Sequence, residues 1–340
     1  MDSAHAQTVL RFAFGVTLAF VVAELMEWKP PFLSAVLTCV VLANIPVRPP
    51  IKVALGFSLV IGASAFFGLF LSMALRGAPH ILFGLSTLIV FLALHALAKG
   101  TPKLAPLFII ICTTAIPVVG MQSLAAAQHF AVAFASGACF AIFMAWVSWL
   151  FFPKAQPPRA PPKASPFPPA IAFRFALLGT AILAPLMLAY LMMGLYTALP
   201  VMIGTVMIVT TLDFHLGRKQ AVLRVVANFA GGVSSVIVLV LLAIHPTLAT
   251  FTLCVLASAL LFGLRISHGD PMAQLLLVAC NGYLIVFGTA LHSDSGTFDV
   301  WVTRVGYFFL AGLFTIGMMA LIWPQSPKPE PTLDQSGGGQ

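Results

Sequence analysis

Long apolar runs separated by short polar breaks repeat from one end of the chain to the other. A helix needs about 20 apolar residues to cross the hydrocarbon core of a bilayer. The runs of 17 residues are therefore short, and they are compatible with tilted, partial or re-entrant segments. The pattern predicts about twelve transmembrane helices, at 10–26, 31–47, 53–75, 79–98, 104–120, 124–152, 171–193, 196–212, 220–244, 246–264, 271–290 and 299–323.

Composition supports an integral membrane protein. Hydrophobic residues make up 60% of the 340 residues and charged residues 8%, whereas a soluble domain has about 25% charged residues. A soluble protein of this size could not bury so much apolar surface. The net charge of +8 does not indicate a nucleic-acid partner, because the basic residues stand singly or in pairs between apolar runs. The predicted fold is all-α, and the predicted environment is a lipid bilayer.

The distribution of basic residues predicts an orientation. If the N-terminus is placed in the cytoplasm, 14 of the 17 Lys and Arg residues fall on the cytoplasmic side, and only Lys29, Arg76 and Arg304 fall outside. Positive charge gathers on the cytoplasmic side of membrane proteins. The sequence therefore predicts a multi-pass protein of the bacterial inner membrane with both termini in the cytoplasm and an even number of spans.

A proline-rich segment divides the chain near its midpoint. Residues 153–170 hold eight prolines, which predict an extended cytoplasmic linker. The segment separates a first six-helix half, 1–152, from a second, 171–324, and residues 325–340 form a cytoplasmic tail.

The two halves resemble each other. An arginine opens the first helix of each half, at Arg11 and Arg174, and other features recur at an offset of 169 residues. These are Pro31 with Pro200, Asn44 with Asp213, Gly62 with Gly231, and Gly100 with Gly269. Six spans return the chain to its starting side, so we expect two parallel repeats related by an axis along the membrane normal, with the substrate site between them.

Residues for catalysis or metal binding do not form a recognisable pattern. The chain has no Gly-x-x-x-x-Gly-Lys-Ser/Thr loop for nucleotides, and its eight histidines are scattered. The five cysteines all lie inside apolar runs without metal-ligand spacing, so we expect buried, reduced thiols. We expect no enzyme, no metal and no cofactor; an intramembrane enzyme is the alternative.

Charged residues inside or beside apolar runs are candidates for function, because burying them in a membrane is costly. Arg11 and Arg174 could line an anion path and bind a carboxylate, or could be anchors that reach the cytoplasmic headgroups. Arg304, on the outer side, could attract an outgoing anion or pair with an acidic neighbour. Asp213 and Glu24 are the candidates for a proton-coupling carboxylate, although a loop salt bridge is the favoured interpretation of Asp213.

The fifth and eleventh runs carry possible helix breaks at corresponding depths. The fifth contains Thr113, Thr114 and Pro117, and the eleventh contains Asn281, Gly282 and Tyr283. Paired interruptions in two repeats indicate a transport site, because broken helices expose backbone groups. We expect two interrupted helices that face each other, with these hydroxyls and the amide orienting a carboxylate. A simple kink is the alternative.

The arginine-led first helix, the two six-helix halves and the small-residue third helices resemble the fusaric acid resistance (FUSC) superfamily. That superfamily includes bacterial aromatic-acid exporters and, more distantly, the plant aluminium-activated malate channels. Its members commonly carry a large cytoplasmic domain after each half, which this chain replaces with a linker and a short tail. The resemblance implies an exporter that works with a periplasmic adaptor and an outer-membrane channel, with Arg11 and Arg174 facing the anion path.

The expected function is secondary export of small organic, above all aromatic, carboxylic acids or related toxic compounds. The negative interior of the cell would favour the exit of an anion by about 2.3 kcal/mol per charge per 100 mV. Two alternatives remain, a channel-like anion conductor and a non-transporting membrane assembly subunit. The sequence also allows a homo-oligomer.

Overall fold

The structure is a computed structural model of the 340-residue chain. It describes residues 3–45, 47–102, 104–153, 167–193, 214–267 and 273–291, together with separate positions between 202 and 210 and between 302 and 321. Arg304, Asp213 and most of the predicted linker, which carry sequence predictions, lie outside these residues.

Ten α-helices make up the described part of the chain. They coincide with ten of the twelve predicted apolar runs, and the runs 196–212 and 299–323 lie largely outside the described residues. The helices are α1 (Ser3–Leu25), α2 (Phe32–Asn44), α3 (Ile51–Leu75), α4 (Pro79–Ala98), α5 (Leu104–Gln122), α6 (Leu124–Phe151), α7 (Pro169–Met193), α9 (Phe214–Ile244), α10 (Leu248–Ile266) and α11 (Ala273–Ala290).

Local signals fix several helix ends. The Ser123 hydroxyl accepts a hydrogen bond from the Ala126 amide at 3.2 Å, and Thr247 accepts one from the Thr250 amide at the same distance. These side chains satisfy amides that have no partner inside α6 and α10. Gly100 ends the α4 region with a φ of 90°, a conformation that favours glycine.

The molecule is an all-α membrane protein. Seven of the ten described helices are long and apolar enough to cross a bilayer, namely α1, α3, α4, α5, α6, α7 and α10. The 13-residue α2 and the apolar parts of α9 and α11, Phe229–Ile244 and Leu275–Ala290, are shorter. A helix of 13 residues is about 20 Å long, so α2 alone does not span a 30 Å hydrocarbon core.

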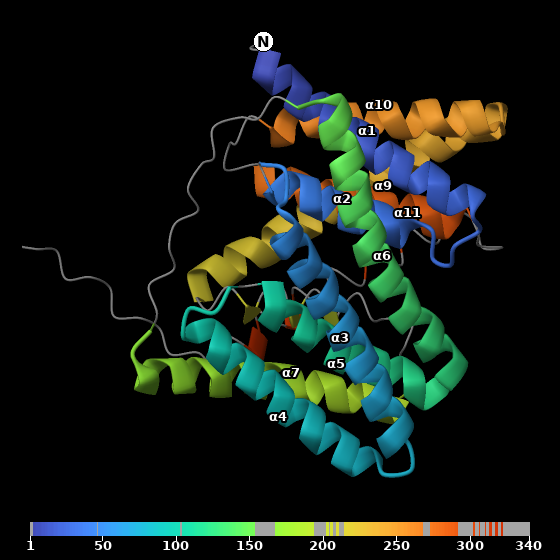
Figure 1. Ribbon diagram of the computed structural model, residues 1–340. Helices are drawn as coiled ribbons and strands as arrows, with labels where there is room; N and C mark the ends of the chain where they lie inside the picture. The colour runs from blue at the N-terminus through green and yellow to red at the C-terminus, as the bar shows by residue number, and fades with distance from the viewer. Residues whose placement is uncertain are drawn as a thin grey trace, which may run out of the picture.

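The helices form two groups that α3 and α6 connect (Figure 1). The upper group in this view contains α1, α2, α9, α10 and α11, and the lower group contains α4, α5 and α7. α6 packs on α1 and α2 in the upper group and on α5 in the lower group. A large cluster of buried residues runs through both groups, with members on α1, α2, α3, α5, α6 and α11, and a smaller cluster lies between α4, α5 and α7.

The contacts between the first and second halves of the chain are reciprocal. α4 packs against α7, the first helix of the second half, and α10 packs against α1, the first helix of the chain. Glycine allows one of these close approaches, because a Cβ at Gly263 of α10 would lie 3.0 Å from the Phe12 ring of α1. Each half therefore covers the opening helix of the other.

Close packing of α3 on α5 also recurs in α9 on α11. A Cβ at Gly68 would lie 2.5 Å from the Cys112 carbonyl oxygen, and a Cβ at Gly231 would overlap the Ala279 carbonyl oxygen. Gly62 lies in a different place, where a Cβ would only touch Ala135 of α6 at 3.7 Å. Gly68 therefore makes the same kind of contact as Gly231, whereas Gly62, which the offset of 169 residues pairs with Gly231, does not.

α5 and α11 are continuous helices, and the prediction that both would be interrupted is wrong. Pro117 lies inside α5 without ending it. The hydroxyls of Thr113 and Thr114 donate to the carbonyls of Ile109 at 2.6 Å and Ile110 at 2.8 Å. Both hydroxyls therefore donate within α5 itself. α11 likewise continues through Asn281 and Gly282 to Ala290.

Candidate functional site

A cavity of about 310 Å³ opens between the α1–α2 turn and the first half of α6. Trp28, Lys29 and Pro30 of the turn form one side, with Leu33 and Ser34 from the start of α2. The other side is one face of α6, and its lining residues are His129, Val132, Ala133, Ser136 and Gly137.

The small residues of α6 determine where the cavity closes. A Cβ at Gly137 would lie 3.2 Å from the Leu37 side chain, so glycine lets α2 approach α6 at the inner end of the cavity. The ring of Trp28, in the α1–α2 turn, also contacts α6. It lies edge-on to Phe140, with the ring centroids 4.9 Å apart. Trp28, 36% of which is exposed, therefore forms an aromatic rim at this end of the cavity.

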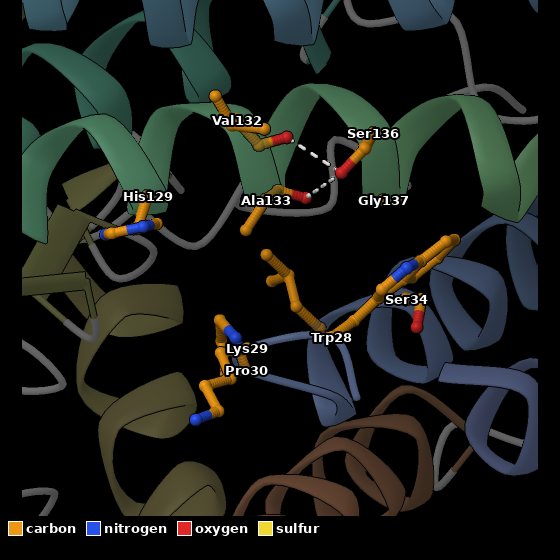
Figure 2. A pocket seen from close by; sticks show the side chains of 10 residues that line it. Trp28, Lys29, Pro30, Ser34, His129, Val132, Ala133, Ser136 and Gly137 are labelled. Carbon is orange, nitrogen blue, oxygen red and sulfur yellow. Dashed lines mark hydrogen bonds between the residues drawn. The ribbon is translucent and has the colours of Figure 1, made fainter. Parts of the chain in front are cut away.

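The polar side chains of the cavity are divided between its two ends. Figure 2 shows Lys29 and His129 on facing elements at one end, with the Lys29 amine directed away from His129, and Trp28, Ser34 and Ser136 at the other end. Both Lys29 and His129 are exposed, and within the described part of the chain neither makes a hydrogen bond or an ion pair. The hydroxyls of Ser34 and Ser136 donate to Pro31 and Val132 carbonyls of their own segments, at 3.1 and 2.8 Å, and can still accept.

This arrangement suits an amphipathic anion. A carboxylate needs a cationic or N–H partner, which Lys29 and His129 can provide. An aromatic ring would contact Trp28 and the apolar side chains of Leu33 and Val132. The cavity residues are not marked in the sequence, because Lys29 and His129 are 100 residues apart in the chain and each resembles an ordinary loop or helix residue.

Arg11 lies in the N-terminal half of α1, about 20 Å along the helix axis from the end of α1 that carries the cavity. Its guanidinium carbon stands 3.5 Å above the centre of the Trp149 ring, and Nη1 donates to the Phe152 carbonyl oxygen at 3.1 Å. The side chain is only 3% exposed. These contacts clamp the start of α1 to the end of α6.

Arg174, the predicted counterpart of Arg11, lies in α7 and is exposed. The two arginines predicted to share one anion path therefore have different surroundings in the structure. Asn44, another marker of the predicted repeat, is also exposed, and its amide nitrogen donates to the Val40 carbonyl oxygen at 2.8 Å. Glu24 is half-buried near the end of α1 that carries the cavity.

The remaining predicted site residues belong to two separate regions. Thr113, Thr114 and Pro117 are buried in α5, which packs on α3, α4 and α6. Asn281 and Tyr283 lie on α11, which packs on α9, α2 and α10. The structure does not bring the two sets together.

The surroundings of Tyr283 are aromatic. Its ring stacks on Phe287, with centroids 5.6 Å apart, and Phe287 stacks in turn on Phe251 at the same distance. The Tyr283 hydroxyl is buried beside Ser258 without a hydrogen bond of ordinary geometry, and the Asn281 amide oxygen is also buried without one. These residues form packed core, where the aromatic rings hold one another.

No group of three or more metal-ligating side chains occurs within the described residues. Two cysteines that are far apart in sequence do lie in contact, Cys39 of α2 and Cys280 of α11, with their sulfur atoms 3.8 Å apart.

Comparison with known proteins matches residues 8–148 to a family described as "Protein of unknown function (DUF2955)". Neither curated proteins nor solved structures gave a match. The family match shows no link to the fusaric acid resistance proteins or to the plant malate channels. It extends from the first turns of α1 almost to the end of α6, so the chain resembles this family over its first six helices.

Proposed function

We propose that the protein is a secondary transporter that exports small organic anions, aromatic carboxylates above all, across the bacterial inner membrane. The observation that carries the proposal is the cavity between the α1–α2 turn and α6. Its lysine, imidazole and indole groups match the charged end and the ring of such a substrate. Lys29 is a strongly hydrated cation, which allows it to hold an anion and release it to water.

The proposed topology has twelve spans in two parallel repeats with both termini in the cytoplasm. The reciprocal packing of α4 on α7 and α10 on α1 supports two equivalent halves. Gly68 and Gly231, which carry the recurring close contact, are separated by 163 residues, as are Arg11 and Arg174. In this orientation the cavity opens to the periplasm and the Arg11 clamp lies near the cytoplasm.

The proposal includes a periplasmic adaptor and an outer-membrane channel as partners. Their support is the resemblance to aromatic-acid exporters, together with a cavity that would open on the side where an adaptor collects substrate. Affinity purification of the chain from its own membranes, with detection of such an adaptor, is the direct test.

Flux of radiolabelled benzoate through proteoliposomes tests the transport function. We expect Lys29→Gln combined with His129→Ala to reduce benzoate flux at least fivefold, because both polar partners of the carboxylate are lost. Lys99→Gln is the matched control, since Lys99 is also an exposed lysine but follows α4, away from the cavity. Organic-anion flux no greater than in empty liposomes, for every acid tried, would overturn the proposal and favour an assembly subunit.

The same preparation separates a transporter from a channel. A transporter that binds substrate in the cavity should saturate at moderate substrate concentration. Unitary currents in a planar bilayer, with flux that saturates only at very high substrate, would establish the channel-like alternative instead.

A further inference from the structure

The contact between Cys39 and Cys280 joins segments that are 241 residues apart in the chain. Cys39 is on α2, before the proline-rich segment, and Cys280 is on α11, after it. Both thiols belong to the large core cluster and are at most 1% exposed. The other three cysteines, Cys112, Cys139 and Cys254, are also free thiols, but no sulfur–sulfur contact involves them within the described residues.

The two sulfur atoms are in contact, 3.8 Å apart. A disulfide has an S–S length of about 2.0 Å, so each sulfur would have to move by roughly 1 Å. Bond formation therefore requires the side chains to rotate and α2 to adjust against α11.

The surroundings favour a neutral product. Phe20, Tyr283, Leu284 and Phe287 belong to the same buried cluster as the two cysteines. A divalent metal held by the two thiolates would need further ligands, and no group of three or more metal-ligating side chains occurs in the part of the chain that the structure describes. A disulfide is neutral and satisfies both sulfurs without any further partner.

We propose that Cys39 and Cys280 form a redox modification site, in which hydrogen peroxide converts the two thiols into a disulfide that ties α2 to α11. In the first step one sulfur attacks the peroxide, its S–H proton is lost, and a sulfenic acid and water form. In the second step the other thiol attacks the sulfenic sulfur, the S–S bond forms, and a second water leaves. One peroxide is reduced and two thiols are oxidised.

The disulfide would hold the two halves together at one point. If transport requires α2 and α11 to move relative to each other, oxidation stops it; this consequence rests on the proposed transport function, whereas the cross-link itself does not. Reaction should be slow, because the thiolate is the reactive form and an apolar core favours the thiol.

The cross-link can be tested in the full chain with a protease site inserted after Arg159, in the proline-rich segment. The background is Cys139→Ser, which removes the exposed thiol. After treatment with hydrogen peroxide and blocking with N-ethylmaleimide, the protein is cut and run on a gel without reductant. We expect the two halves to migrate together, and to separate when reductant is added.

Two variants and a matched control decide the assignment. Cys39→Ala and Cys280→Ala should each release the halves without reductant, while Cys254→Ala, a change at a partly buried cysteine of α10, should not. Size-exclusion elution before treatment shows that each variant is folded, and intact mass should show the loss of two hydrogens only where both thiols are present. Halves that separate after oxidation of the parent, or that stay joined in Cys39→Ala, would overturn the proposal.

Benzoate flux tests the arrest of transport separately from the formation of the Cys39–Cys280 cross-link. We expect the oxidised parent to lose flux and to recover it on reduction, while Cys280→Ala loses none. This result would support the lock, that is, the arrest of transport by the disulfide. A cross-linked protein with unchanged flux keeps the site and overturns the lock. A protein that cross-links but never transports overturns the transport function and leaves the site standing.

Discussion

Arg11 and Arg174 show how two residues with the same place in the sequence pattern acquire different surroundings. Arg11 is covered by Trp149 and bound to the Phe152 carbonyl oxygen, whereas Arg174 is exposed. A desolvated cation above an indole contributes about 2 kcal/mol, and a hydrogen bond from a charged group contributes a similar amount. The structure therefore places Arg11 among the residues that hold α1 and α6 together.

Replacing Arg11 should destabilise the protein. We expect Arg11→Ala to reduce the free energy of unfolding by about 2–4 kcal/mol, because the stacking and the charged hydrogen bond are both lost. Arg11→Lys should recover part of this loss, since an ammonium lacks the planar fork of a guanidinium. The measurement is the apparent melting temperature in detergent, with Arg174→Ala as the control that should melt like the parent.

A different result would restore the anion-path interpretation of Arg11. If Arg11→Ala melts at the parent temperature but transports benzoate slowly, the guanidinium acts on the substrate and its contacts with α6 are secondary.

Helix–helix packing in this protein depends on a few glycines. The recurring contacts of α3 with α5 and of α9 with α11 place helix backbones where a Cβ would meet a carbonyl oxygen. Close approach of this kind replaces the hydrophobic driving force that is missing between helices in lipid. In the second pair the approach is strengthened by Ser235, whose hydroxyl lies 2.9 Å from the Tyr283 carbonyl oxygen of α11.

Alanine at these glycines should therefore loosen the helix pairs. We expect Gly68→Ala and Gly231→Ala each to cost about 1–3 kcal/mol of stability, because a backbone must move to admit the methyl group. Gly62→Ala is the matched control on α3: its methyl group would find ordinary contact at 3.7 Å, and alanine favours the helix. Equal melting temperatures for Gly68→Ala and Gly62→Ala would show that the close contact does not limit stability.

Most helices could be predicted from the sequence, because a membrane helix satisfies its own backbone and is marked by its apolar length. The continuity of α5 through Pro117 could not be predicted, since a proline breaks a helix only where the surroundings do not compensate. Here residues 106–108 and 110–120 of α5 are buried among neighbouring helices, and the sequence pattern does not show that. The cavity and the Cys39–Cys280 contact depend on which helices pack together, and periodicity does not encode that.

At the scale of the whole molecule, the two halves of the chain are interdependent. α1 and α4 each bury a face against a helix of the second half, α10 and α7 respectively. The family match covers residues 8–148, which correspond to α1 to α6. Two of these helices, α1 and α4, also pack against helices that lie outside the matched region.

The first half alone should consequently be unstable. We expect residues 1–160 expressed alone to aggregate or to be degraded, because the faces of α1 and α4 that contact α10 and α7 remain uncovered. Co-expression with residues 161–340 should restore a complex that elutes at the position of the intact chain. The measurement is fluorescence-detected size exclusion of membrane extracts, and a monodisperse, protease-resistant 1–160 fragment would contradict the expectation.

The packing of α1 on α10 also has a consequence for synthesis. The partner of the first helix leaves the ribosome only after about 240 further residues have been made. At about 5–20 residues per second this delay lasts roughly 10–50 s. Throughout that interval the Phe12 face of α1 has only lipid, or an insertion factor, to cover it. The order in which helices are translated thus differs from the order in which they can assemble, and the nascent chain must be kept from pairing with a neighbouring copy until α10 arrives.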